Sequence, residues 1–255
     1  MLRKILCAAA LAAALCLSLP SAALAAGPGT VSGNWRQENG QWYYSDTNGS
    51  MLTGWILVNG KYYYLYGDGH CAMNEITPDG YRVDESGAWY EVTRDILGQK
   101  FTVPVRFASP EVLGEAWGEN SEALAGLGMA VSAAFGGTRK LSVSGDMIEY
   151  LSVQGDARYM GLYKDYQENG YRLDLRIRLD QGGAGENRYA EYSYGVFKAM
   201  AATVSSTPDL LEEAIYSAWQ GQNTYGINRA APVQVGDCTV TYEAGEGYGK
   251  FFIRP

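Results

Sequence analysis

Aromatic side chains near the N-terminus recur at one spacing, and their rings are the groups with which this chain could do chemistry. Trp35, Trp42 and Tyr44 are each followed, twenty residues later, by another aromatic residue. Those later residues are Trp55, Tyr62 and Tyr64. Rings with an apolar face and a polar edge suit binding more than proton transfer. The spacing therefore predicts aromatic pockets that repeat along the chain.

Hairpins are the elements that would position these rings. Asn39-Gly40 and Asn59-Gly60 are strong signals for two-residue hairpin turns, because both residue types tolerate positive φ. The aromatic runs beside them favour strands, and residues 79–90 form a third, divergent copy. An isolated hairpin is barely stable in water. We therefore expect the hairpins of residues 33–92 to stack as a solenoid with aromatic pockets between neighbours.

This pattern resembles the choline-binding, or cell-wall-binding, repeats of Gram-positive bacteria. The resemblance rests on a Gly-Trp pair, an Asn-Gly turn before an aromatic triplet, and a Gly-x-Met segment, over about a quarter of the chain. It implies that rings of successive hairpins enclose the quaternary ammonium of teichoic-acid choline through cation–π attraction. The residues implied are Trp35, Trp42, Tyr44, Met51, Trp55, Tyr62, Tyr64, Met73, Trp89 and Tyr90.

Position by position, the resemblance implies two cages. The first would use Trp35, Trp42 and Tyr64, with Met51 lining it. The second would use Trp55 and Tyr62 near Met73, closed by Tyr90 or Trp89. Only two copies match the motif well, and the second has tyrosine where tryptophan is usual. The alternative is that the rings only stack the hairpins into a stalk.

The N-terminus predicts export. Residues 1–25 join a basic start, an apolar run and a small-x-small end, which is typical of a signal peptide, and residues 26–32 read as a linker. We expect a secreted, extracellular, wall-associated protein with no transmembrane segment after cleavage. Cleavage of the signal peptide would leave 18 of the 20 basic side chains against 28 acidic ones. This acidic balance disfavours nucleic acid as a partner.

Few residues could bind a metal ion or act as a catalytic nucleophile. His70 is the one histidine, which excludes histidine-rich metal sites, and we expect no metal and no cofactor. Cys71 and Cys238 remain in the mature chain, and an oxidising exterior leaves a disulfide between them open.

Residues 95–255 predict an α+β domain, an antiparallel sheet with helices on one face. Strands are expected near 139–153, 157–165 and 170–180, helices before Gly136 and after Thr207, and a hairpin at the end. In layout this region resembles modules that accompany such repeats in other surface proteins.

The function of this domain stays open between a non-catalytic binding module and a hydrolase. Asp209, Glu212 and Glu213 are the carboxylates that could act as acid and base, although charge in the first turn of a helix explains them as well. A glycan or protein partner would meet a tentative recognition patch, made of Arg172, Arg176, Arg178, Tyr225, Asn228 and Arg229. We expect a surface protein that binds choline-bearing wall polymers and displays a non-catalytic domain, with a wall-remodelling hydrolase as the alternative.

Overall fold

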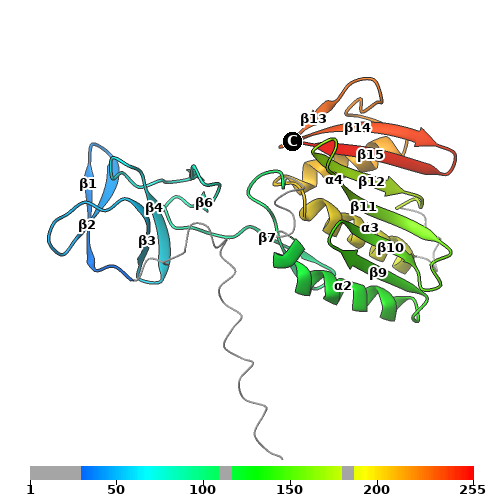
Figure 1. Cartoon of the computed structure of the whole chain (residues 1–255), viewed down its shortest axis with the longest axis horizontal. Helices are drawn as coiled ribbons and strands as arrows, with labels where there is room; N and C mark the ends of the chain where they lie inside the picture. The colour runs from blue at the N-terminus through cyan, green and yellow to red at the C-terminus, as the bar shows by residue number, and fades with distance from the viewer. Residues whose placement is uncertain (1–29, 109–116, 180–186) are drawn as a thin grey trace, which may run out of the picture. The chain divides into compact units, whose positions relative to one another are not determined.

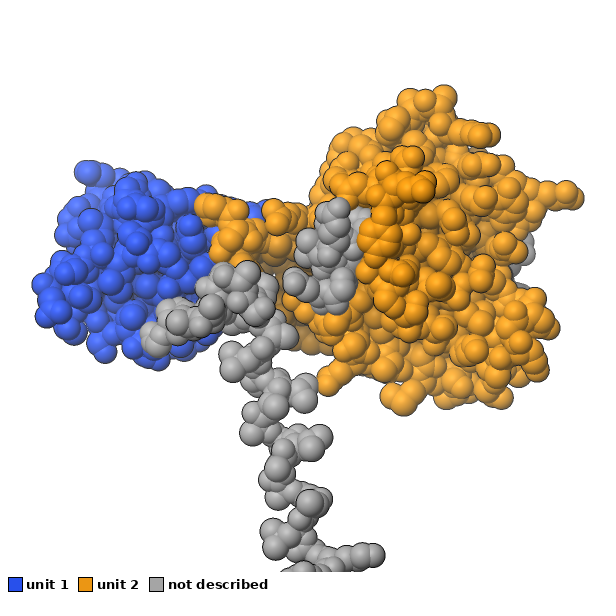
Figure 2. All heavy atoms as spheres, viewed as in Figure 1, with its two compact units in different colours: residues 1–77, 83–89 blue, residues 78–82, 90–255 orange. Residues whose placement is uncertain are grey.

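The computed structural model describes residues 30–108, 117–179 and 187–255. The predicted signal peptide and most of the linker therefore lie outside the described residues. The chain divides into two compact units (Figure 2). One contains residues up to 77 together with 83–89, and the other contains residues 78–82 together with 90–255.

Two antiparallel hairpins form the body of the first unit. β1 (Gly33–Glu38) pairs with β2 (Gln41–Asp46), and β3 (Gly54–Val58) pairs with β4 (Lys61–Leu65). The predicted turns are confirmed: Asn39 and Asn59 have φ of 52° and 51°, and the following glycines are also positive. Each hairpin is a separate two-stranded sheet, linked to later segments by isolated bridges.

The divergent third copy is reduced to very short strands. β5 (Glu75–Ile76) pairs with β6 (Arg82–Val83) as another two-stranded sheet. A further hairpin, β7 (Thr93–Ile96) with β8 (Gln99–Thr102), belongs to the second unit and places Phe101 in its core.

A seven-stranded sheet, antiparallel at every pairing, forms the second unit (Figure 1). In spatial order its strands are β13 (Val233–Val235), β14 (Cys238–Gly245), β15 (Tyr248–Arg254), β12 (Gly170–Leu175), β11 (Arg158–Asp165), β10 (Met147–Ser152) and β9 (Arg139–Ser144). This confirms the antiparallel sheet expected from the sequence.

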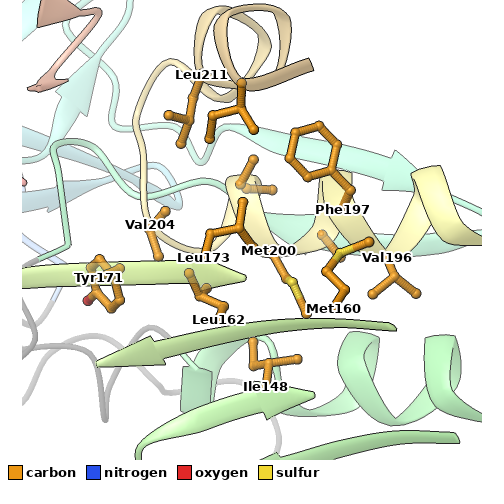
Figure 3. Packing of buried hydrophobic residues seen from close by; sticks show 14 of the residues in the cluster. Ile148, Met160, Leu162, Tyr171, Leu173, Val196, Phe197, Met200, Val204 and Leu211 are labelled. Carbon is orange, nitrogen blue, oxygen red and sulfur yellow. The ribbon is translucent and has the colours of Figure 1, made fainter. Parts of the chain in front are cut away.

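Three helices pack against one face of this sheet: α2 (Ser121–Ala134), α3 (Asn187–Ala202) and α4 (Pro208–Trp219). Figure 3 shows α3 side chains such as Phe197 and Met200 against Leu162 and Leu173 of the strands. None of the helices in these described ranges is long and apolar enough to cross a membrane.

Two predicted strands differ from the observed ones. The strand expected at 139–153 is a hairpin, because the chain turns at Gly145-Asp146 between β9 and β10. The strand expected at 170–180 ends at Leu175. Alternation of apolar and polar residues continues past that point, so the pattern alone overestimates its length.

Candidate functional site

Trp35 and Trp42 form a right-angled pair of rings on one face of the first hairpin. Trp35 lies opposite Tyr44, and Trp42 lies opposite Gln37, so the strand pleat directs all four side chains to the same face. The two indole centroids are 6.5 Å apart with their planes at 86°. Both indoles are half-buried. Such a pair provides two adjoining walls for a cation.

Tyr63 is the ring of the second hairpin that packs against Trp35. Their centroids are 4.9 Å apart, and Tyr44 lies on the same indole at 5.0 Å. Tyr44, 2% exposed, is buried with Ile56 and Leu65 in the core of this unit. The first hairpin therefore stacks on the second through Tyr44 and Tyr63.

The predicted cage of Trp35, Trp42 and Tyr64 is not assembled as proposed. Tyr64 pairs with Trp55, 5.4 Å away, on the opposite face of the second hairpin from Tyr63. The reason is the two-residue period of a strand, which sends neighbouring tyrosines to opposite faces. The twenty-residue spacing identifies equivalent positions in successive copies, but it does not show which face of one hairpin packs against the next.

Tyr62 and Trp89 repeat the geometry of the first pair. Their centroids are also 6.5 Å apart, at 83°, and the Trp89 amide donates to the Tyr62 carbonyl at 2.8 Å. Of the two residues expected to close the second cage, Trp89 meets Tyr62. Tyr90 is 42% exposed and belongs to the second unit.

Met51 lies away from the cage that it was expected to line. Met51 covers the backbone of Gly69 beside Tyr43, whose side chain leaves the strand on the opposite face from Trp42. Met73 packs against the core that contains Cys71. Cys71, twenty residues after Met51, holds the equivalent position, since its sulfur lies against Gly87 as that of Met51 lies against Gly69.

A row of rings that the sequence analysis did not propose extends from Tyr64. Tyr66 lies 5.4 Å from Tyr64 at 88°, and His70 stacks on Tyr66 at 4.3 Å. His70 Nδ1 lies 2.6 Å from a carboxylate oxygen of Asp68, and this hydrogen bond lowers the pKa of Asp68. Tyr64 and Tyr66 are two residues apart, so an extended chain places their side chains on the same face. This spacing is the sequence signal that could have predicted the row.

Of the three arginines in the tentative recognition patch, Arg172 lies within a strand. Arg172 lies on β12, where its Nε donates to Asp174 at 3.0 Å and its guanidinium covers the Tyr163 ring at 4.6 Å. Arg176 and Arg178 follow the end of that strand. Both are exposed, while Leu179 is buried and Ile177 packs against the core, so the alternation of exposed and buried side chains continues past Leu175, the last residue that pairs with β15.

Two of the three loop residues of that patch make contacts that stabilise the loop. Tyr225 packs partly against the core. The Asn228 amide accepts from Ala230 and Ala231 at 2.8 and 3.1 Å and donates to Gly226 at 2.9 Å. Arg229 is exposed.

Glu212, a candidate acid, is buried and paired. Arg94 of β7 donates to both of its carboxylate oxygens and to Asp209 at 2.9 Å. Burial raises the pKa of Glu212, and the Arg94 hydrogen bond and charge oppose that rise. This carboxylate therefore joins β7 to α4.

The two cysteines within the described residues are free thiols, so the disulfide left open by the sequence is not formed. Cys71 and Cys238 are buried in different units, and burial raises the pKa of each thiol to about 12. Their sulfurs donate to the carbonyls of Ala72 and Val235. Across the part of the chain that the structure describes, no cluster of acidic, histidine and cysteine side chains could hold a metal ion.

Two family models match segments within residues 33–89. The choline-binding repeat matches residues 54–89, and the cell wall binding repeat matches residues 33–51. A comparison with curated proteins gives no match.

Solved structures with similar repeats come from Streptococcus pneumoniae. Choline binding protein F, in the presence of a peptidoglycan analogue, is 49% identical over 24% of this chain and 20% of its own, with a TM-score of 0.22. The choline binding domain of Spr1274 is 45% identical over 23% of this chain and 82% of its own, also with a TM-score of 0.22. The match to choline binding protein F thus spans a fifth of that protein, and these comparisons concern the repeats alone.

Proposed function

Because residues 33–89 are choline-binding repeats, we propose that this protein is secreted and is held at the cell wall by choline-bearing polymers. The hairpins stack as a short solenoid, and the second unit is displayed from it as a non-catalytic binding domain. Localisation at the extracellular wall follows from the predicted signal peptide together with the repeats.

The observation that carries this proposal is the perpendicular pair of Trp35 and Trp42, with centroids 6.5 Å apart and both rings half-buried. A trimethylammonium group is weakly hydrated and gains about 0.5–2 kcal/mol from each ring face that it meets. Tyr62 and Trp89 offer a second pair with the same spacing. The cages are therefore assigned to Trp35 with Trp42 and to Tyr62 with Trp89, in place of the groupings that repeat spacing suggested.

A non-catalytic second unit is supported by the ion pairs of three carboxylates, of which Asp174 and Glu212 are buried and Glu149 is half-buried. Glu212 is bound to Arg94, Asp174 to Arg172 at 3.0 Å, and Glu149 to Arg158 at 2.7 Å. Carboxylates held in this way stabilise the fold, whereas a glycosidase needs two acids free to exchange protons. Zymography on purified wall material tests the hydrolase alternative, since a cleared band would show cleavage.

Chromatography on a choline-substituted resin tests the binding function. We expect the protein to be retained and to elute with free choline. Trp42→Ala should weaken choline binding about 2- to 30-fold, which corresponds to one lost ring contact. Tyr166→Ala, at an aromatic residue of the second unit that is 59% exposed, is the matched control. If the unaltered protein passed through the resin without being retained, the alternative that the repeats form only a stalk would be favoured.

A further inference from the structure

Two arginines meet at one tyrosine ring on the face of the seven-stranded sheet opposite the helices. Leu162 and Leu173 lie in the core on the helix-covered face (Figure 3). Their neighbours Tyr163 and Arg172, which lie opposite each other on β11 and β12, therefore point to the other face. The guanidinium carbon of Arg172 lies 4.6 Å from the centre of the Tyr163 ring, and that of Arg158 lies 5.8 Å from it. Two cationic groups are thus gathered at one point of this face.

An irregularity in the strand pairing brings Arg158 to this face. Arg158 is five residues before Tyr163, so strict alternation would place the two side chains on opposite faces. The pairing of β11 with β10 shifts between Tyr150 and Leu151, so that Leu151 is opposite Arg158, and Tyr159 packs against the core. Bulges of this kind redirect side chains and are frequent beside functional sites.

Two carboxylates hold the arginines from beneath. The Arg158 Nε lies 2.7 Å from Oε1 of Glu149, and the Tyr163 hydroxyl donates to the same oxygen at 2.9 Å. The Arg172 Nε donates to Asp174 at 3.0 Å. The side chains of Glu149 and Asp174 are only 13% and 11% exposed, whereas those of Arg158 and Arg172 are 46% and 40% exposed. A ligand that approaches from solvent therefore meets the guanidinium groups first.

The hydrogen bonds that remain on the two arginines are positioned in advance. Both guanidiniums are engaged through Nε, which leaves the two terminal amino groups of each without a hydrogen-bond partner among the described residues. The Tyr163 ring lies over Gly161, where a Cβ would collide with the ring, so the lack of a side chain at 161 makes room for it. Groups held in this way lose little freedom when they bind a ligand.

We propose that Arg158, Tyr163 and Arg172, held by Glu149 and Asp174, form a binding site for a phosphate group. The planar fork of a guanidinium matches two oxygens of a phosphate or a carboxylate. One such fork occupies both oxygens of a carboxylate. The oxygens of a tetrahedral phosphate point in different directions, so phosphate can accept from both guanidiniums at once. Two arginines at one ring therefore select phosphate.

Directed hydrogen bonds, more than net charge, should determine the affinity of this site. Each guanidinium already has a carboxylate partner, so the four charges cancel. Lysine keeps the charge of arginine but not its planar fork. Replacing either arginine by lysine should therefore weaken phosphate binding even though the charge is unchanged.

This site gives the second unit a ligand class. A polymer that bears phosphate groups as well as choline could be held by both units, and linking two binding modules raises the overall affinity for it. This use at the wall rests on the proposed function, whereas binding of phosphate by the second unit does not.

Titration of the ¹⁵N-labelled protein with inorganic phosphate at constant ionic strength tests the site, with the Nε–Hε resonances of the arginines as the readout. We expect the resonances of Arg158 and Arg172 to shift along a saturable curve and that of the exposed Arg229 to stay unchanged. Arg172→Lys should raise the dissociation constant for phosphate at least tenfold, and Arg229→Lys is the matched control that should not. Arg158→Lys provides a second variant should Arg172→Lys fail to fold, as thermal unfolding would reveal.

Acetate in place of phosphate, at the same ionic strength, distinguishes the two classes of anion. We expect no saturable shift with acetate. Equal affinity for acetate would make this a carboxylate site and overturn the assignment to phosphate, and the absence of a saturable shift with phosphate would overturn the site itself. Phosphate binding that survives in both lysine variants would do the same. Choline plays no part in this titration, so its failure and the failure of wall binding by the repeats can be told apart.

Discussion

The sulfur of Met51 occupies the place where a side chain on Gly69 would begin. Gly69 is buried and has φ of +89°. Gly49, twenty residues earlier, has φ of +84°, but nothing lies within 4 Å of the position its Cβ would take. Gly69 is therefore required for both space and conformation, whereas Gly49 is required for conformation alone.

Gly69→Ala should destabilise the repeat unit more than Gly49→Ala. Positive φ costs both variants about 1–2 kcal/mol, and crowding against Met51 should add about 1–3 kcal/mol at Gly69. Urea unfolding followed by tryptophan fluorescence measures the difference. Equal losses in the two variants would show that Met51 moves aside without cost.

Tyr62→Trp should strengthen choline binding at the second ring pair. Tryptophan offers the best ring face for a cation, and Tyr62 stands where the first repeat has Trp42. We expect a gain of about 2- to 5-fold in affinity, measured by calorimetric titration with choline.

Tyr63→Trp is the control for that substitution, because Tyr63 packs between the hairpins against Trp35. Its larger ring should lower stability and leave choline affinity without a gain. If Tyr62→Trp behaved in the same way, Tyr62 would belong to the stack and not to a binding site.

Arg94→Ala should destabilise the second unit and make its stability depend on pH. Removing one partner leaves the buried Glu212 charge unpaired, which costs about 3 kcal/mol near neutral pH. Burial already raises the pKa of Glu212, and loss of Arg94 removes the two strongest opposing causes. A carboxyl whose folded pKa is raised stabilises the fold below its unfolded pKa and loses that contribution as pH rises through the folded value.

The stability gap between Arg94→Ala and the unaltered protein should therefore narrow as pH falls from about 7 to about 5. Thermal or urea unfolding at several pH values measures this gap. Glu212→Gln removes the ionisable group, so the gap between Arg94→Ala/Glu212→Gln and Glu212→Gln alone should stay constant over this pH range. A gap that widens on acidification would contradict the role assigned to Glu212.

The sequence by itself determined the hairpins and most of the helices and strands. Asn39-Gly40 and Asn59-Gly60 specify their turns through local conformational preference. Thr207 similarly precedes a helix that begins at Pro208. These features depend on neighbours within a few residues. They can be recognised without knowing what packs around them.

Only the tertiary structure decided which rings meet. Trp35 contacts Tyr63 and not Tyr64 because two hairpins stack face to face, and a one-residue difference in a strand changes the face to which a side chain points. The same holds for Arg94 and Glu212, which are 118 residues apart and pair because β7 packs against α3 and α3 packs against α4. Contacts of this kind depend on how whole elements pack, and twenty-residue spacing carries no information about it.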